Sequence, residues 1–573
     1  MNTIQARSLP LLIIGIIFCL GFKGENPYPT DYFRAPVNTP LRLSGTFGEL
    51  RSNHFHAGID IKGAIGVPLV AIAEGYIWRI KVEAGGYGNV LYIKHPNGFT
   101  SVYAHMNKFA PEVAEYVKSR QYQAQQFQQD LYPNPEQFPV GKGEKIGEMG
   151  TSGYSFGPHL HFEIRDSKTE KTINPLLFGL DVPDTRQPRM HQIRVYELNN
   201  QRETQKAKSY SLYSKGQWMG LKGDTVYVDQ PNVGIGLKVY DHMNGVNNWN
   251  GIYALDVYLE DSLLYNYTME SFSFDESRYL NAHLDYREQV TAKSYFNRTF
   301  KLPGNKLSIY KEESNHGVVW VNSDKAQKVV MKARDIEGNT SQLRFWVKQR
   351  QSPQEANAPN YNYLLPYDEE NMIDNGSLKI HMPKGTLYEN LYLSYESVED
   401  PAKDIFSNVH HLHDNKTPIH LYYDIAIRPT RLPEELERKA FIANCTNDNR
   451  IINYGGEWED GRLKTQVRNL GDFCIMVDTI APTIAIRRFS SNMRAYDQMS
   501  FIIRDNVATS GRAKGLRFRG TIDGQWVLME YDLKNDRLTH RFEDRLPSGQ
   551  HQLRLEVWDS QGNTRILERK FST

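Results

Sequence analysis

The segment GPHLHFEI, residues 157–164, places two histidines two positions apart in a strand-like run that follows a glycine-proline turn. Successive side chains of a β-strand point to opposite faces, so His159 and His161 share one face while Leu160 and Phe162 share the other. We therefore expect the apolar face of this strand to pack in a core and the face with the two imidazoles to carry chemistry.

A second segment, HFHAGIDI at residues 54–61, contains His56 and Asp60 at an even spacing, which would put both on one face of a strand. A catalytic zinc ion takes three imidazole or carboxylate ligands and leaves one position for water. His56, Asp60 and one histidine of the downstream pair could supply these ligands. The run VYAHM adds His105. A metal with two spare histidines suits hydrolysis, because the metal acidifies water while the histidines move protons or hold an oxyanion.

The chain contains another His-x-His pattern in HHLHD, residues 410–414. Nothing similar to HAGID lies near it and no glycine-proline turn precedes it, so we interpret it as a solvated polar loop. Glu163 follows the first pair and leaves two alternatives open. It could orient a metal ligand from a second layer, or it could be a surface carboxylate.

The first block resembles the LytM/lysostaphin-type zinc endopeptidases, peptidase family M23, over about 150 of the 573 residues. It has the family's His-x-x-x-Asp, Tyr-x-His, Val-x-x-Gly-x-x-Ile-Gly and His-x-His motifs. The resemblance implies a zinc ion bound by His56, Asp60 and His161, with water in the fourth position. It assigns His105 and His159 to catalysis, as base and oxyanion stabiliser. It also implies a small two-layer antiparallel β-sheet domain with a groove, and substrates that are peptide bonds in peptidoglycan stems or cross-bridges.

The whole chain is predicted to be mainly β, because Val, Ile, Thr and Tyr recur between turns rich in Gly, Asn and Asp. The net charge of +1 gives no reason to expect nucleic acid as a partner. Residues 26–180 are the expected peptidase domain, with a helical insert at 108–139 that is long for the family. Its helix is predicted over residues 111–131, since proline stands at the start and apolar residues follow at helical spacing.

The rest of the chain contains an internal repeat. DTRQP and DTIAP begin two β-rich blocks, DIEGN and DSQGN lie one strand before the ends of these blocks, and VYDHMNG resembles IRDNVATSG between them. We therefore predict immunoglobulin-like β-sandwiches at 183–350 and 478–573. Residues 355–477 are predicted to be a β-rich domain of uncertain type.

Residues 1–24 are predicted to be an export signal, because the apolar stretch 9–22 follows Arg7 and is short for a membrane span. The mature chain should then lie in the periplasm or cell envelope without a membrane span. Lipid attachment at Cys19 stays open. Cys445 and Cys474 could form a disulfide or remain two free thiols.

These observations predict an exported zinc endopeptidase that hydrolyses peptide cross-links of peptidoglycan, with the sandwiches positioning it on the wall or against envelope protein partners. One alternative is a non-catalytic regulator that activates other wall hydrolases. Another is an adhesin or carbohydrate-binding array with a vestigial peptidase, because sandwich domains serve many functions.

Overall fold

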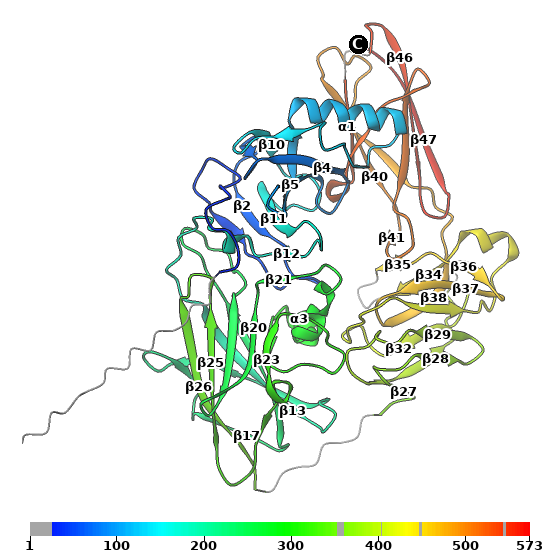
Figure 1. Cartoon of the computed structure of the whole chain (residues 1–573). Helices are drawn as coiled ribbons and strands as arrows, with labels where there is room; N and C mark the ends of the chain where they lie inside the picture. Colours follow the sequence, from blue (N-terminus) through cyan, green and yellow to red (C-terminus); the bar gives the residue numbers. More distant parts are fainter. Residues whose placement is uncertain (1–25, 352–359, 403, 446–449, 543–545) are drawn as a thin grey trace, which may run out of the picture.

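The computed structural model describes residues 26–351, 360–402, 404–445, 450–542 and 546–573. The export signal predicted at 1–24 and Cys19 lie outside the described residues. The chain is mainly β, as the sequence predicted. The ribbon runs from the first domain through three further β-rich blocks, and the last block comes back beside the helix α1 of the first (Figure 1).

The first domain contains a large antiparallel sheet and a small one. The central order of the large sheet is β1-β2-β11-β6-β5-β4-β8, and that of the small sheet is β3-β10-β7. The strands of the large sheet are β1 (Leu43–Gly45), β2 (Ile59–Lys62), β4 (Gly75–Val82), β5 (Asn89–Lys94), β6 (Phe99–Ala104), β8 (Gln129–Leu131) and β11 (His159–Asp166). Those of the small sheet are β3 (Pro68–Val70), β7 (Met106–Phe109) and β10 (Lys145–Met149).

The strand β11 has the predicted alternation. Leu160, Phe162 and Ile164 are fully buried in the core of the domain. The opposite face is also buried, since His161 and Glu163 are shielded from solvent. Burial on both faces means that every polar atom on the histidine side needs a partner within the protein.

The predicted insert helix ends earlier than its sequence pattern indicated. Helix α1 covers Pro111–Ala124 and buries Val113 and Val117, while Gln125 takes a left-handed conformation with φ 48°. The prediction of a helix to residue 131 was wrong because residues 129–131 form β8 and pair with β4 in the large sheet. Backbone pairing with a sheet edge thus replaced the last two helical turns.

The second block packs two sheets on one hydrophobic core, with Ile193 and Ile235 from one sheet against Met331 and Phe345 from the other. The first sheet contains β13 (Arg189–Leu198), β14 (Thr204–Ser211), β18 (Asn232–Tyr240), β22 (Asn297–Arg298) and β24 (Val319–Trp320). The second contains β15 (Tyr213–Ser214), β16 (Met219–Gly220), β17 (Thr225–Val228), β19 (Ala254–Leu259), β20 (Ser262–Thr268), β23 (Tyr310–Glu313), β25 (Gln327–Arg334) and β26 (Thr340–Gln349). Two short helices, α2 (Leu280–His283) and α3 (Tyr286–Ala292), lie between β20 and β22 in sequence.

The third block also has two main sheets around a shared core. One contains β28 (Asn371–Asp374), β29 (Leu378–Met382), β33 (Tyr423–Ile427), β36 (Glu457–Glu459) and β37 (Arg462–Val467). The other contains β31 (Tyr395–Val398), β32 (Val409–Leu412), β34 (Ala440–Cys445), β35 (Ile451–Asn453), β38 (Gly471–Val477) and β41 (Ala508–Thr509). Cys445 and Cys474 are free thiols whose Sγ atoms lie 3.4 Å apart, so the second of the two alternatives describes this structure.

The last block packs two four-stranded sheets against each other. They contain β39 (Thr483–Arg488), β40 (Gln498–Arg504), β44 (Glu530–Asp532) and β45 (Arg537–Arg541), and β42 (Arg517–Ile522), β43 (Gln525–Trp526), β46 (Gln550–Trp558) and β47 (Thr564–Ser572).

Both the second and the last block contact the first domain. The strand β12 (Thr172–Ile173) pairs with β21 (Ser271–Phe272), which extends the large sheet into the second block. From the last block, Lys534 Nζ donates to the main-chain oxygens of Thr151 (3.2 Å) and Ser155 (2.8 Å), in the loop before His159. None of the helices in the described part of the chain combines the length and apolar character that crossing a membrane requires.

Candidate metal centre

Two neighbouring strands bring the first two side chains of the cluster together. In the antiparallel register of β2 and β11, Asp60 lies directly opposite His161. Gly58, which precedes β2, passes so close to β11 that a Cβ atom there would meet the Phe162 oxygen at 2.2 Å. A side chain at residue 58 would therefore push the two strands apart.

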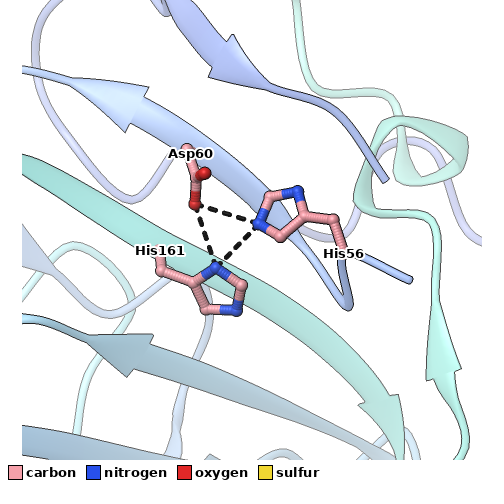
Figure 2. Close-up of side chains that lie close together, drawn as sticks. All are labelled: His56, Asp60 and His161. Atoms are coloured by element: carbon pink, nitrogen blue, oxygen red, sulfur yellow. Dashed lines mark hydrogen bonds and ion pairs between the residues drawn. The ribbon is translucent and has the colours of Figure 1, made fainter. Parts of the chain in front are cut away.

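His56 reaches the cluster from a loop rather than from the strand that its spacing predicted. β2 begins at Ile59, and the chain before it folds back so that the His56 N–H donates to the Glu49 oxygen. The prediction of one continuous strand through His56 and Asp60 was wrong because the segment turns at Ala57–Gly58. The turn still points the imidazole of His56 at Asp60 (Figure 2).

The three side chains converge on one point. His56 Nε2 and His161 Nδ1 lie 2.9 Å apart, and each lies 3.0 Å from Asp60 Oδ1. Figure 2 shows the three atoms at the corners of a triangle. All three residues are buried. The family resemblance implied these three residues as metal ligands, and the structure places their ligand atoms close enough together to hold one ion.

The hydrogen bonds of the two imidazoles show which nitrogen carries the proton. His56 Nδ1 donates to the Thr46 oxygen at 2.8 Å, and His161 Nε2 donates to Glu163 Oε1 at 2.8 Å. The nitrogens that face each other at 2.9 Å, His56 Nε2 and His161 Nδ1, are therefore the two that can offer lone pairs to a cation when both rings are neutral. Two imidazole lone pairs and a carboxylate oxygen are the donor set that fits zinc.

The pKa values of the three clustered side chains reflect two opposing effects. Burial disfavours the charged form of each group, and the contacts between the groups favour it. Burial disfavours the charge of Asp60, but His56 and His161 outweigh this effect and hold the pKa of Asp60 well below its usual value. Burial lowers the pKa of His56 to about 4, which keeps its imidazole neutral at neutral pH. Burial also disfavours charge on His161, but Asp60 and Glu163 raise its pKa to about 9. In the metal-free chain His161 thus carries the proton that a cation would displace.

A second layer fixes the ring of His161. Glu163 is fully buried, and although burial alone would raise its pKa, Arg165 and His161 lower it to about 2. Arg165 Nε donates to Glu163 Oε2 at 2.6 Å, and the Tyr87 hydroxyl donates to Glu163 Oε1. The ring of Tyr87 also packs 4.9 Å from that of His161. Glu163 is therefore an orienting residue and not a surface carboxylate, which decides between the two alternatives that the sequence left open.

His105 and His159 lie beside the cluster. Their ring centroids are 4.8 Å apart, and His159 Nε2 is 3.6 Å from Asp60 Oδ1. His105 Nδ1 donates to the Ser152 oxygen and His159 Nδ1 to the Gly157 oxygen, both at 2.8 Å, so Nε2 is the nitrogen without a proton in the neutral form of each ring. Burial, together with the nearby His161 and His159, lowers the pKa of His105 to about 3 and keeps it neutral.

Sequence reasoning missed Arg51. Its Nη2 lies 2.7 Å from Asp60 Oδ2 and 3.1 Å from Glu49 Oε2, so it neutralises the carboxylate oxygen that faces away from the two histidines. The side chain of Arg51 is 37% exposed, so the guanidinium is accessible at the edge of the cluster. No local spacing signals this contact, because Arg51 reaches Asp60 through a fold-back of the chain.

The His-x-His pattern at 410–414 forms no such cluster. His411 in β32 pairs with Asp472 on the neighbouring strand at 2.7 Å, and His413 lies beyond the end of the strand with φ 55°. His413 Nδ1 lies 3.3 Å from the Ser394 hydroxyl oxygen. Among the residues that the structure describes, none of the groups able to hold a metal ion includes these histidines.

Comparisons with known proteins find a family match for the first domain and another for the third block. Residues 54–136 and 134–175 match peptidase family M23, and residues 362–478, the third block, match a Zu5-like domain. The first domain is similar to the DD-carboxypeptidase/endopeptidase Mpg of Neisseria meningitidis, with 34% identity over 151 residues, 26% of this chain and 29% of that protein. It is also similar to the murein hydrolase activator NlpD of Escherichia coli, with 34% identity over 150 residues, 26% of this chain and 32% of that protein.

The chain thus spans less than a third of the length of these curated relatives. A solved structure, the catalytic domain of the prophage-encoded M23 protein EnpA from Enterococcus faecalis, is 23% identical, with a TM-score of 0.20 and coverage of 26% of this chain and 98% of that one. The sequence motifs and the family match coincide on the same residues. The segment from residue 54 to residue 175, which carries the His-Asp-His cluster, is a peptidase family M23 domain.

Proposed function

We propose that this chain is an exported zinc endopeptidase that hydrolyses peptide cross-links of peptidoglycan. The observation that carries the proposal is the convergence of two imidazole lone pairs and one carboxylate oxygen, with two more imidazoles beside them. The similarity of the first domain to a DD-carboxypeptidase/endopeptidase supports the substrate class.

The chain's own residues would divide the work as follows. His56 Nε2, Asp60 Oδ1 and His161 Nδ1 would hold the zinc ion, and the hydrogen bond from His161 Nε2 to Glu163 would keep the imidazole of His161 oriented for this role. Zinc bound there supplies Lewis acidity, which lowers the pKa of a water molecule and polarises a peptide carbonyl.

The two remaining histidines move the proton and hold the developing charge. His105, neutral and with Nε2 free, accepts the proton of the attacking water. His159 is held by the Gly157 oxygen at Nδ1, and with a proton on Nε2 as well it donates to the oxygen of the tetrahedral intermediate. The side chain of His159 is 16% exposed, so solvent reaches it, and a substrate would contact the cluster from this side.

The test is the release of fragments from defined cross-linked muropeptides, followed by mass spectrometry. Zinc-loaded wild-type chain should cut a peptide bond, and Asp60→Asn or a chelator should stop the cutting while the thermal unfolding of the later blocks is unchanged. Equal fragment release by the wild type and Asp60→Asn would contradict the proposal.

A second candidate function is activation of another wall hydrolase, which the similarity to NlpD favours. The same variant separates the two functions, because an activator that works by contact would still stimulate a partner hydrolase as Asp60→Asn. The complete set of five side chains favours the enzyme.

Two further parts of the proposal concern location and partners. The apolar stretch 9–22 directs export to the periplasm or cell envelope, and the β-rich blocks after residue 183 hold the peptidase against the wall or an envelope protein. Fractionation of cells that express the full chain should place the protein in the envelope, and deletion of residues 2–24 should retain it in the cytoplasm.

A further inference from the structure

The second and the last block each gather three aspartates at matching places in their sheets. The groups are Asp184, Asp241 and Asp335, and Asp478, Asp505 and Asp559. In each group the first aspartate lies five residues before the first strand (β13 or β39), the second directly follows that strand's partner (β18 or β40), and the third directly follows the penultimate strand (β25 or β46).

The third aspartate of each group is held by the same turn. Asp335 accepts from the Asn339 N–H at 2.8 Å, and Asp559 accepts from the Asn563 N–H at 2.8 Å. Each asparagine side chain also donates to the main-chain oxygen of the first aspartate of its group, at 3.1 Å to Asp184 and 2.8 Å to Asp478. The internal repeat in the sequence therefore preserves a three-dimensional arrangement of carboxylates and not only a turn.

In the second block all three carboxylates are buried and offer oxygens within 4.8 Å of one another. None of the three forms an ion pair with a Lys or Arg within 4.0 Å among the described residues. Burial, together with the negative charges of Asp335 and Asp184, raises the pKa of Asp241 to about 7. The charge of Arg186 opposes this rise only in part, and a cation among the three carboxylates would favour the ionised form of Asp241.

Unpartnered polar atoms point to the missing cation. Asp184 and Asp241 are only 8% and 3% exposed, and their atoms Asp184 Oδ2 and Asp241 Oδ1 have no hydrogen-bond partner among the described residues. Asn250 is 1% exposed, and within the part of the chain that the structure describes neither the nitrogen nor the oxygen of its side-chain amide has a hydrogen-bond partner. Asp241 and Asn250 exchange two main-chain hydrogen bonds, so their side chains stand on the same face as an antiparallel pair. Buried polar atoms nearly always have a hydrogen-bond partner. Here four such atoms, from these three residues, have none among the described residues.

We propose that each group of three aspartates binds one calcium ion, so that the chain carries two structural calcium sites in addition to the zinc centre. The Asn250 side-chain oxygen completes the ligands of the site in the second block. The last block offers the same three carboxylates, of which Asp478 and Asp559 are buried and Asp505 is half-buried.

Calcium fits the donors better than zinc or magnesium. The donors are all oxygens, which hard cations prefer, and no imidazole or thiol belongs to either group. Oxygens up to 4.8 Å apart can bind one ion at the calcium–oxygen distance of about 2.3–2.6 Å. Magnesium demands shorter bonds, of about 2.0–2.1 Å, in a strict octahedron and retains several waters, which a buried site of three fixed carboxylates does not accommodate.

The sites would fix how successive blocks join. Asp184 lies between the peptidase domain and β13, and Asp478 lies between β38 and β39. A cation that binds Asp184 together with Asp241 and Asp335 ties this connecting segment to the end of the following sandwich. The orientation of the zinc centre relative to the later blocks would then depend on calcium.

The experiment measures calcium bound per chain by equilibrium dialysis at about 1 mM free calcium, within the range typical of extracellular calcium modules. It uses the full chain with zinc already bound, so that the His-Asp-His cluster does not contribute. The variants are Asp241→Asn, Asp505→Asn and the double variant. Asp261→Asn is the matched control, because this carboxylate is 99% exposed in the second block.

We expect two calcium ions per chain for the wild type and for Asp261→Asn, one for each single variant and none for the double variant. A rise in the melting temperature of the wild type on addition of calcium should be lost in the double variant. Absence of calcium binding by the folded wild type, or two ions still bound by a folded double variant, would overturn the proposal. The wild-type measurement alone decides the matter if a variant fails to fold.

Discussion

The strands β11 and β32 each carry a histidine that faces an aspartate on the neighbouring strand, yet within the described residues only the pair on β11 belongs to a group that could hold a metal ion. His161 lies opposite Asp60, and His411 lies opposite Asp472. The side chains of the first pair are 4% and 8% exposed, and those of the second pair are 40% and 28% exposed. Both strands therefore have a cross-strand His–Asp pair. The pair on β11 differs because it is buried and lies beside a third candidate ligand.

The third ligand depends on what the chain does next to each pair. His56 comes in from the loop before β2 and completes the first cluster. Beside His411, the strand ends at Leu412 and His413 takes a left-handed conformation, so the strand does not continue through the second histidine of the motif. The local pattern His-x-His thus has meaning only where the strand continues through both residues and another segment supplies a ligand.

The largest difference in turnover is expected between substitutions of Asp60 and of Asp472, the aspartates of the two pairs. Asp60→Asn should lower turnover of a cross-linked muropeptide by more than about 100-fold, because loss of a ligand exceeds the cost of losing a second-layer partner. Asp472→Asn, the same substitution at the exposed pair, should leave turnover and zinc content unchanged. Turnover assays and zinc analysis on both variants check this, and similar losses in the two would refute the distinction.

The next effect concerns a histidine that is not a ligand. His105→Ala should reduce kcat by about 10²–10⁴-fold, the range for removal of a general base, while zinc content stays at one per chain. Steady-state kinetics and metal analysis of one preparation test it. Joint loss of zinc and activity would instead show that His105 helps to hold the metal.

A smaller effect is expected in the second layer. Glu163→Gln removes the charge that orients His161 and should weaken zinc affinity by about 10–100-fold. Competition with a chromogenic chelator measures the affinity. Glu370→Gln is a matched control, since Glu370 contacts the half-exposed His381 in the third block. An unchanged zinc affinity in Glu163→Gln would mean that the hydrogen bond from His161 to Glu163 does not contribute to zinc binding.

The smallest effect, on the free energy of unfolding, is expected for the exposed pair of His411 and Asp472. His411→Ala should change the free energy of unfolding by no more than about 1 kcal/mol, because exposed ion pairs contribute little. Chemical denaturation followed by fluorescence gives this value. A loss of several kcal/mol would show that the pair is structurally important and that exposure is a poor guide here.

The sequence allowed prediction of the parts of the site that follow local rules. Alternation along residues 159–164 placed two histidines on one face and the core on the other, and the mainly β architecture followed from composition and turns. The geometry around His56 could not be predicted in the same way. Its strand was expected to run through residue 56, but the chain bends at Gly58, where it passes close to β11, and the strand begins only at Ile59.

Contacts that join distant segments were beyond local reasoning. Arg51 reaches Asp60 through a folded-back loop, and Tyr87 reaches Glu163 from the connection between β4 and β5. The early end of α1 arises because residues 129–131 find a free sheet edge in β4. Such outcomes depend on tertiary hydrogen bonds, and no periodicity in the sequence encodes them.

The most direct test of the central claim is a crystal of the zinc-soaked full chain measured at the zinc absorption edge. We expect a strong anomalous peak between His56 Nε2, Asp60 Oδ1 and His161 Nδ1, and no peak at His411 or His413. A zinc-saturated crystal without density at the first cluster, or with its strong peak at the second, would contradict it.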